Sequence, residues 1–120
     1  MAKGKIEETA GIAAVRRALD GATDRDTLAT AVRYLLQVLE ARFPGKSVEV
    51  RVPPFGAAQC LEGPGHTRGT PPNVIETDAQ SWLALATGRL LWSDGVASGR
   101  IHASGLRADL TSFVPLLSVA

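Results

Sequence analysis

The chain has 120 residues, with 13 basic and 12 acidic side chains and a formal net charge of +1. This charge balance is that of an ordinary soluble domain, and it argues against nucleic-acid binding. The length predicts one domain, residues 1–120. The single cysteine, Cys60, excludes an internal disulfide, and no apolar run approaches the ~20 residues that span a bilayer. We therefore expect a cytoplasmic protein that does not insert into a membrane.

The first part of the chain, residues 1–45, is predicted to be helical. In residues 6–20, apolar side chains recur at spacings of three and four, which indicates a helix that ends at Gly21. Thr23 or Asp24 can cap a second helix. The apolar residues of this second helix form one continuous stripe: Leu28, Val32, Leu35, Leu36, Leu39 and Phe43.

From residue 46 to residue 120 the patterns indicate a sheet with further helices. Apolar and polar residues alternate in residues 47–52, which predicts a half-buried strand, and residues 55–62 and 74–77 predict two more. The segment Gly63–Asn73 is rich in Gly and Pro and is predicted to be a loop. Short connections between successive strands favour antiparallel pairing.

The last third of the chain is predicted to alternate between helix and strand. Asp78 caps a helix that Gly88 ends, and a second short helix and the strand "RIHAS" follow. A final helix is expected over Leu110–Leu117, which Pro115 must kink because it has no N–H. An apolar sheet face covered by helices makes this an α+β fold.

Few residues are candidates for chemistry. Cys60 and His66 are the one plausible nucleophile–base pair, but apolar neighbours surround Cys60, which favours a core residue. His66 and His102 are isolated and lack ligand spacing, so we expect neither a metal nor another cofactor. The glycines of the Gly63–Asn73 loop, with His66 and Arg68 as donors, could hold an anion, or the loop could simply be a rigid connection.

The stretch from Glu76 to Leu117, "ETDAQSWLALATGRLLWSDGVASGRIHASGLRADLTSFVPLL", resembles the C-terminal half of sterol carrier protein-2-type domains. The shared features are an acidic residue that opens a helix, Asp78, a glycine that ends it, a short second helix, and the strand after Ser98-Gly99-Arg100. The stretch "VEVRVPPFGAAQCLEGPGHTRGTPPNVIETD" is similar to the actinobacterial branch of sterol carrier family proteins. The resemblance implies a curved antiparallel sheet of about four to five strands, covered on one face by about five helices.

The resemblance also implies a non-catalytic protein that binds or transfers a lipid or another apolar ligand between sheet and helices. We expect the apolar wall of this site to consist of Val48, Val50, Val52, Trp82, Leu85, Trp92, Phe113 and Leu117. The alternative is that these side chains simply fill a core that has no cavity. His66 and Arg68 are expected to meet a ligand head group.

Two other functions stay open at this point. The chain could be an interaction or accessory module without a ligand, and could form a homodimer through its second helix if the apolar stripe is wider than one sheet face can cover. It could also be a small enzyme that uses the Gly63–Asn73 loop.

Overall fold

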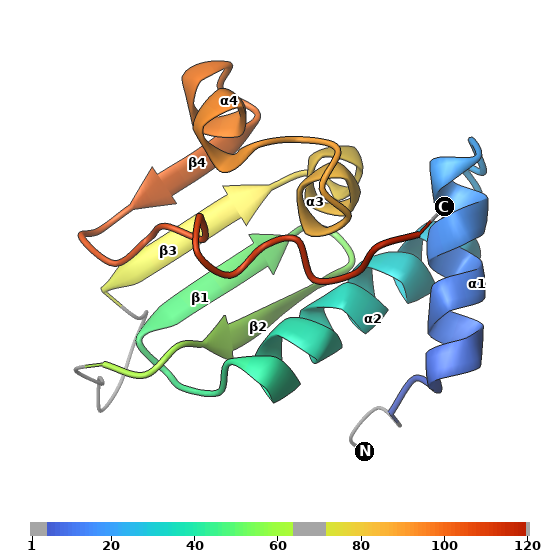
Figure 1. Ribbon diagram of the computed structural model, residues 1–120, viewed down its shortest axis with the longest axis horizontal. Helices are drawn as coiled ribbons and strands as arrows, with labels where there is room; N and C mark the ends of the chain where they lie inside the picture. Colours follow the sequence, from blue (N-terminus) through green and yellow to red (C-terminus); the bar gives the residue numbers. More distant parts are fainter. Residues whose placement is uncertain (1–4, 64–71, 120) are drawn as a thin grey trace.

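The fold is described from a computed structural model, which covers residues 5–63 and 72–119. Four helices and four strands lie in these residues (Figure 1). In chain order they are α1 (Glu8–Leu19), α2 (Arg25–Arg42), β1 (Val48–Val52), β2 (Gly56–Cys60), β3 (Asn73–Thr77), α3 (Ala79–Ala86), α4 (Trp92–Ala97) and β4 (Ile101–Ser104).

The ends of the helices follow local signals that the sequence shows. The Asp24 carboxylate accepts hydrogen bonds from the backbone N–H and the hydroxyl of Thr27, and so caps α2. Asp78 caps α3 in the same way, through the N–H of Ser81. Gly88, with φ +82°, ends α3 in the left-handed region that favours glycine. The four predicted helices before residue 100 are therefore confirmed.

The sheet is mixed, which corrects the antiparallel sheet expected from the sequence. Its strand order is β2-β1-β3-β4, and β3 runs parallel to β1 while the other two pairs are antiparallel. The physical reason is that β3 pairs with the edge of β1 opposite to β2. The hairpin occupies one edge of β1, and two reversals of the chain restore the direction of β1. A strand that then adds to the far edge of β1 must be parallel to it.

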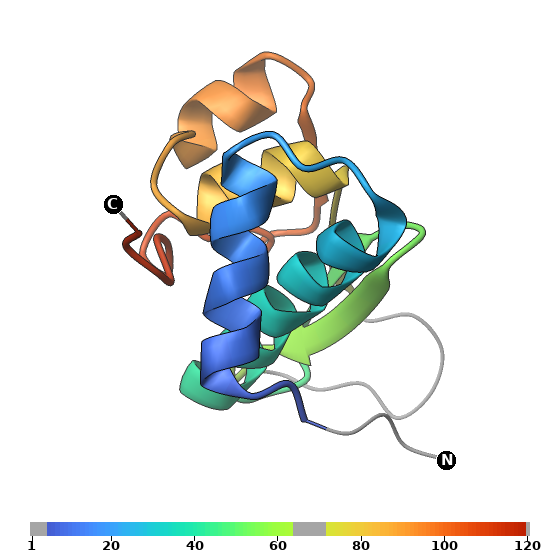
Figure 2. The same cartoon turned by 90° about the vertical axis from the view of Figure 1, so that its right-hand side faces the viewer.

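The two faces of the sheet differ, as the alternation in residues 47–52 predicts. The helices cover one face: α2 lies over β2, and α1 packs on α2 on the side away from the sheet (Figures 1 and 2). The opposite face carries Glu49, Arg51, Glu76 and His102, of which the last three are in register across β1, β3 and β4. Glu49 and Arg51 form an ion pair of 2.6 Å there, so this face carries charged side chains.

The expected final helix over Leu110–Leu117 is wrong, and with it the count of about five helices. Residues 110–119 contain turns and irregular chain (drawn in red in Figure 1). Pro115 supplies no N–H and disfavours the helical conformation of the residue before it. The N–H groups of Leu116 and Leu117 bond instead to the carbonyl oxygen of Ala86, at 2.7 and 3.2 Å. Residues 110–119 are called the C-terminal segment below.

Candidate functional site

The sheet side of the predicted wall lies in a filled core. Val48, Val50 and Val52 point toward the helices, and each is fully buried. From the opposite side come Trp82 and Leu85 of α3, which are also fully buried. The structure therefore brings these five residues together between sheet and helices, in one cluster of buried apolar side chains.

Trp82 is the largest of these buried side chains, and it ties α3 to α2. Its indole Nε1–H donates to the carbonyl oxygen of Val32 at 3.3 Å, inside the core. Such a partner is what a buried indole requires. A ligand between sheet and helices would have to displace this side chain.

The remaining wall residues lie nearer to the surface. Trp92, Phe113 and Leu117 are half-buried. The ring of Phe113 packs edge-on against that of Phe43, with 5.0 Å between their centres. Of these three residues, the structure places Trp92 in one cleft with Leu85 and places Phe113 in another.

The cleft that contains Leu85 and Trp92 lies between the end of α3, the start of α4 and the C-terminal segment. Its volume is about 280 Å³. Most of its lining is apolar: Leu85, Leu90, Leu91, Trp92, Val114 and Pro115. Leu91, 66% exposed, lies at its mouth, and no charged residue lines it. We call it the α3–α4 cleft, and its chemistry suits an apolar ligand.

The C-terminal segment forms one wall of this cleft. Leu110 and Leu116 anchor the segment in the core. The guanidinium of Arg42 donates from Nη1 to the carbonyl oxygen of Leu116 at 2.9 Å, and the N–H groups of Leu116 and Leu117 donate to the carbonyl oxygen of Ala86. Two buried leucines and three hydrogen bonds therefore hold the C-terminal segment in its position as one wall of the cleft.

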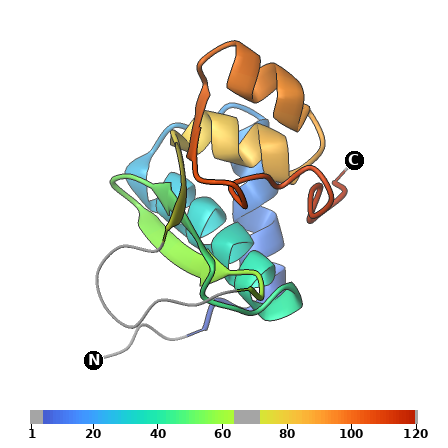
Figure 3. The same ribbon diagram turned by 90° about the vertical axis from the view of Figure 1, so that its left-hand side faces the viewer.

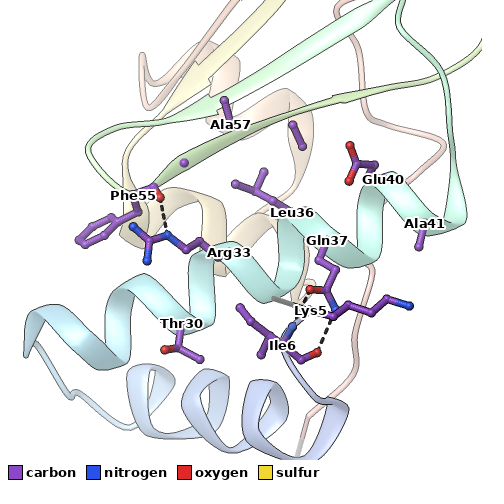
Figure 4. Close-up of a pocket in the computed structure, with 12 residues that line it drawn as sticks. Lys5, Ile6, Thr30, Arg33, Leu36, Gln37, Glu40, Ala41, Phe55 and Ala57 are labelled. Carbon is purple, nitrogen blue, oxygen red and sulfur yellow. Dashed lines mark hydrogen bonds between the residues drawn. The ribbon is translucent and has the colours of Figure 1, made fainter. Parts of the chain in front are cut away.

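Three other hollows are larger but more polar. One, of about 400 Å³, lies on the other side of the C-terminal segment, where Arg42 and Arg107 join Phe43 and Phe113. Another, of about 560 Å³, lies beside α1 and α2, and its lining includes Glu8 and Arg42. The third, of about 740 Å³, is an open groove between α2, β2 and the segment at Ile6 (Figure 4).

Polar contacts organise the larger groove. Arg33 donates from Nε to the carbonyl oxygen of Phe55 at 2.7 Å. Gln37 exchanges two hydrogen bonds with the backbone of Ile6, at 2.9 and 3.0 Å, as Figure 4 shows. The lining also includes the charged side chains of Lys5 and Glu40, which an apolar ligand would remove from water, so the groove is less suited to an apolar ligand than the α3–α4 cleft.

Several residues of the α3–α4 cleft were not predicted. Leu90 and Leu91 lie between α3 and α4, where no helical periodicity of apolar residues indicates which side chains are buried. The run of apolar residues in "RLLW" after Gly88 is the signal in the sequence that could have pointed to them. Val114 and Pro115 belong to the segment predicted as a helix. The predicted head-group residues, His66 and Arg68, lie outside the residues that the structure describes.

The geometry around Cys60 does not favour a nucleophile. Burial, with a smaller contribution from the carboxylate of Glu40, raises the pKa of the Cys60 thiol to about 11. At neutral pH the side chain is therefore a protonated thiol rather than a reactive thiolate. Within residues 5–63 and 72–119, no group of three or more His, Cys, Asp or Glu side chains could hold a metal ion.

The same part of the chain contains no helix that combines the length and the apolar character needed to cross a membrane. None of the curated proteins compared with the chain matches it. A family model described as a bacterial SCP ortholog, where SCP stands for sterol carrier protein, matches residues 24–116. This range runs from the cap of α2 to the buried Leu116 and includes every element except α1. The chain therefore belongs to the bacterial family of sterol carrier protein-like domains.

Proposed function

We propose that the protein binds the apolar part of a lipid, such as an acyl chain, in the α3–α4 cleft. The observation that carries this proposal is an apolar cleft, lined by Leu91 and Trp92, in a chain whose family suggests lipid binding or transfer in general. Burial of the exposed Leu91 side chain against a ligand supplies a driving force of about 25 cal/mol per Å² of apolar surface.

The size of the cleft limits the ligand. At about 280 Å³, it lies at the low end of the ~300–1,000 Å³ typical of ligand sites. A flexible acyl chain can enter in part and leave its remainder outside, whereas a rigid ring system cannot. The proposal therefore favours a linear chain.

The two tryptophans provide a test that locates the ligand. A brominated fatty acid quenches the fluorescence of a tryptophan that it touches, and Trp82 is fully buried while Trp92 lines the cleft. Protein freed of lipid should show saturable quenching at micromolar concentrations. Trp82→Phe should keep this quenching, and Trp92→Phe should lose most of it.

A matched pair of variants checks the cleft itself. Leu91→Asp should weaken binding of the fatty acid by at least about tenfold, since burial of a leucine side chain contributes about 1.5–3 kcal/mol. Leu106→Asp introduces the same change at a side chain that is fully exposed elsewhere, and should leave binding unchanged. Quenching of Trp82 alone would place the ligand between sheet and helices, and no saturable binding would remove the proposal.

The alternative of an accessory module receives less support. It relied on the apolar stripe of α2 being wider than one sheet face covers. In the structure, α1 covers α2 on one side and the sheet covers it on the other, and Val32, Leu35 and Leu39 are fully buried. Light scattering on the purified protein tests this alternative, which requires a complex with a second chain.

A further inference from the structure

Apolar side chains gather around the mouth of the α3–α4 cleft. Leu91 is 66% exposed, Pro115 is exposed, and Trp92, Val114 and Leu117 are half-buried. They come from two stretches, Arg89–Trp92 and Val114–Leu117, which lie side by side where α3 passes into α4 (Figure 3). These two stretches are called the α3–α4 corner below.

Charged side chains flank this apolar surface: two are basic, and one, the exposed Asp94 in the first turn of α4, is acidic. Arg89 is exposed at the start of the first stretch. Arg42, also exposed, bonds to the carbonyl oxygen of Leu116 from the other side. Residues 110–119 contain no charged side chain. The corner thus combines leucines, a tryptophan at the boundary with solvent, and Arg89, with Arg42 beside it.

We propose that the α3–α4 corner is the surface by which the protein docks on an anionic lipid bilayer. The inference rests on the proposed function, because a lipid that occupies the cleft must pass between the cleft and a membrane. Leu91 and Pro115 enter the outer part of the bilayer, and the indole of Trp92 lies at the level of the head groups. Arg89 and Arg42 attract the anionic head groups.

The extent of the corner favours a bilayer over a protein partner. A stable protein interface takes about 800 Å² and 20–30 residues from each side. The corner offers two stretches of four residues. A bilayer needs no complementary shape, and a few inserted side chains with adjacent positive charge are enough for reversible binding.

Co-sedimentation with vesicles tests this inference. The whole chain, freed of lipid, is mixed at low salt with vesicles of phosphatidylcholine alone or of phosphatidylcholine with phosphatidylglycerol. The protein should sediment with the mixed vesicles, and added salt should weaken the association. No association with the mixed vesicles would overturn the inference.

Charge-reversal variants locate the surface. Arg89→Glu should weaken the association with mixed vesicles about tenfold. The control is Arg25→Glu, which makes the same change at an exposed residue at the opposite end of α2 from Arg42. The control should bind as the parent does. If both variants lose the same affinity, the association follows net charge and the corner is not the docking surface.

The same variants separate this inference from the proposed function. Arg89 does not line the cleft, so Arg89→Glu should keep the affinity for the brominated fatty acid in the absence of vesicles. A protein that binds the fatty acid but no vesicles refutes the docking surface and leaves the proposed function intact. A protein that binds vesicles through Arg89 but takes up no fatty acid supports the surface and refutes the cleft.

Discussion

The helix α2 and the C-terminal segment share one sequence pattern and differ in structure. In both, apolar residues recur at spacings of three and four, but α2 is helical from Arg25 to Arg42 while residues 110–119 are irregular. The difference lies in the local signals and in the partners of the backbone. Asp24 caps α2, whereas Pro115 interrupts the segment and Ala86 accepts its next two N–H groups.

The two regions also differ in the surfaces that they leave beside them. Between α1 and the sheet, α2 packs its stripe into a dense core. The C-terminal segment follows an irregular path, and a cleft remains on each side of it. Hollows lie beside both regions, but the groove along α2 and β2 is lined by charged side chains, whereas the cleft that the irregular chain leaves beside α3 and α4 has an apolar lining without charge. The comparison teaches that the chemistry of the lining, and not the size of the hollow, sets the candidate site apart.

The largest expected effect separates the core from the wall of the cleft. Trp82→Ala removes a fully buried side chain and its hydrogen bond to α2, and should lower the free energy of unfolding by about 3–5 kcal/mol. Trp92→Ala, at a half-buried position, should lower it by about 1 kcal/mol. Urea denaturation measures both, and equal losses would contradict the division into core and cleft.

A second pair of variants asks whether the C-terminal segment belongs to the core. Leu110 is fully buried, so Leu110→Ala should lower the free energy of unfolding by about 3 kcal/mol. This loss is expected although Leu110 belongs to no helix or strand. Leu106→Ala, at a fully exposed side chain close in sequence, should change it by less than about 0.5 kcal/mol. A small loss at Leu110 would show that the segment is loosely attached.

The pH dependence of stability probes how dry the core is at β2. Burial raises the pKa of the Cys60 thiol from 9.0 to about 11. The unfolded chain then loses this proton at a lower pH than the folded chain does. Stability contributed by the neutral thiol is therefore complete below pH 9 and is lost as the pH rises toward 11.

Comparison with Cys60→Ala isolates this contribution, because other groups that titrate in this range are common to both proteins. Thermal unfolding of the parent should decline more steeply above pH 9 than that of the variant. Parallel curves would mean that solvent reaches the thiol.

The smallest effect is expected from Pro115→Ala. The substitution removes the local obstacle to a helix, but the burial of Leu110 and Leu116 and the bonds to Ala86 stay in place. Far-UV circular dichroism should therefore show no gain of helix. A clear gain would mean that Pro115 alone, and not the tertiary contacts, keeps the C-terminal segment irregular.

The candidate site was only partly within reach of sequence reasoning. The sequence points to Leu85 and Trp92, which the structure brings together in the α3–α4 cleft. It does not separate the half-buried Trp92 from Val48 and Trp82, which are fully buried in the core with Leu85, because burial and exposure to a cleft leave the same apolar residues in the sequence. Leu91 and Pro115 belong to no periodic pattern of apolar residues, because they lie outside the helices and strands.

The sequence by itself determined the helices before residue 100 and the four strands, since caps, glycines and alternation act over a few residues and need no distant partner. The tertiary structure alone decided the parallel pairing of β3 with β1, the irregular path of the C-terminal segment and the clefts beside it. Each of these depends on which distant backbone groups and side chains compete for the same partner, as when the carbonyl oxygen of Ala86 takes the N–H groups of Leu116 and Leu117. No local pattern encodes that competition.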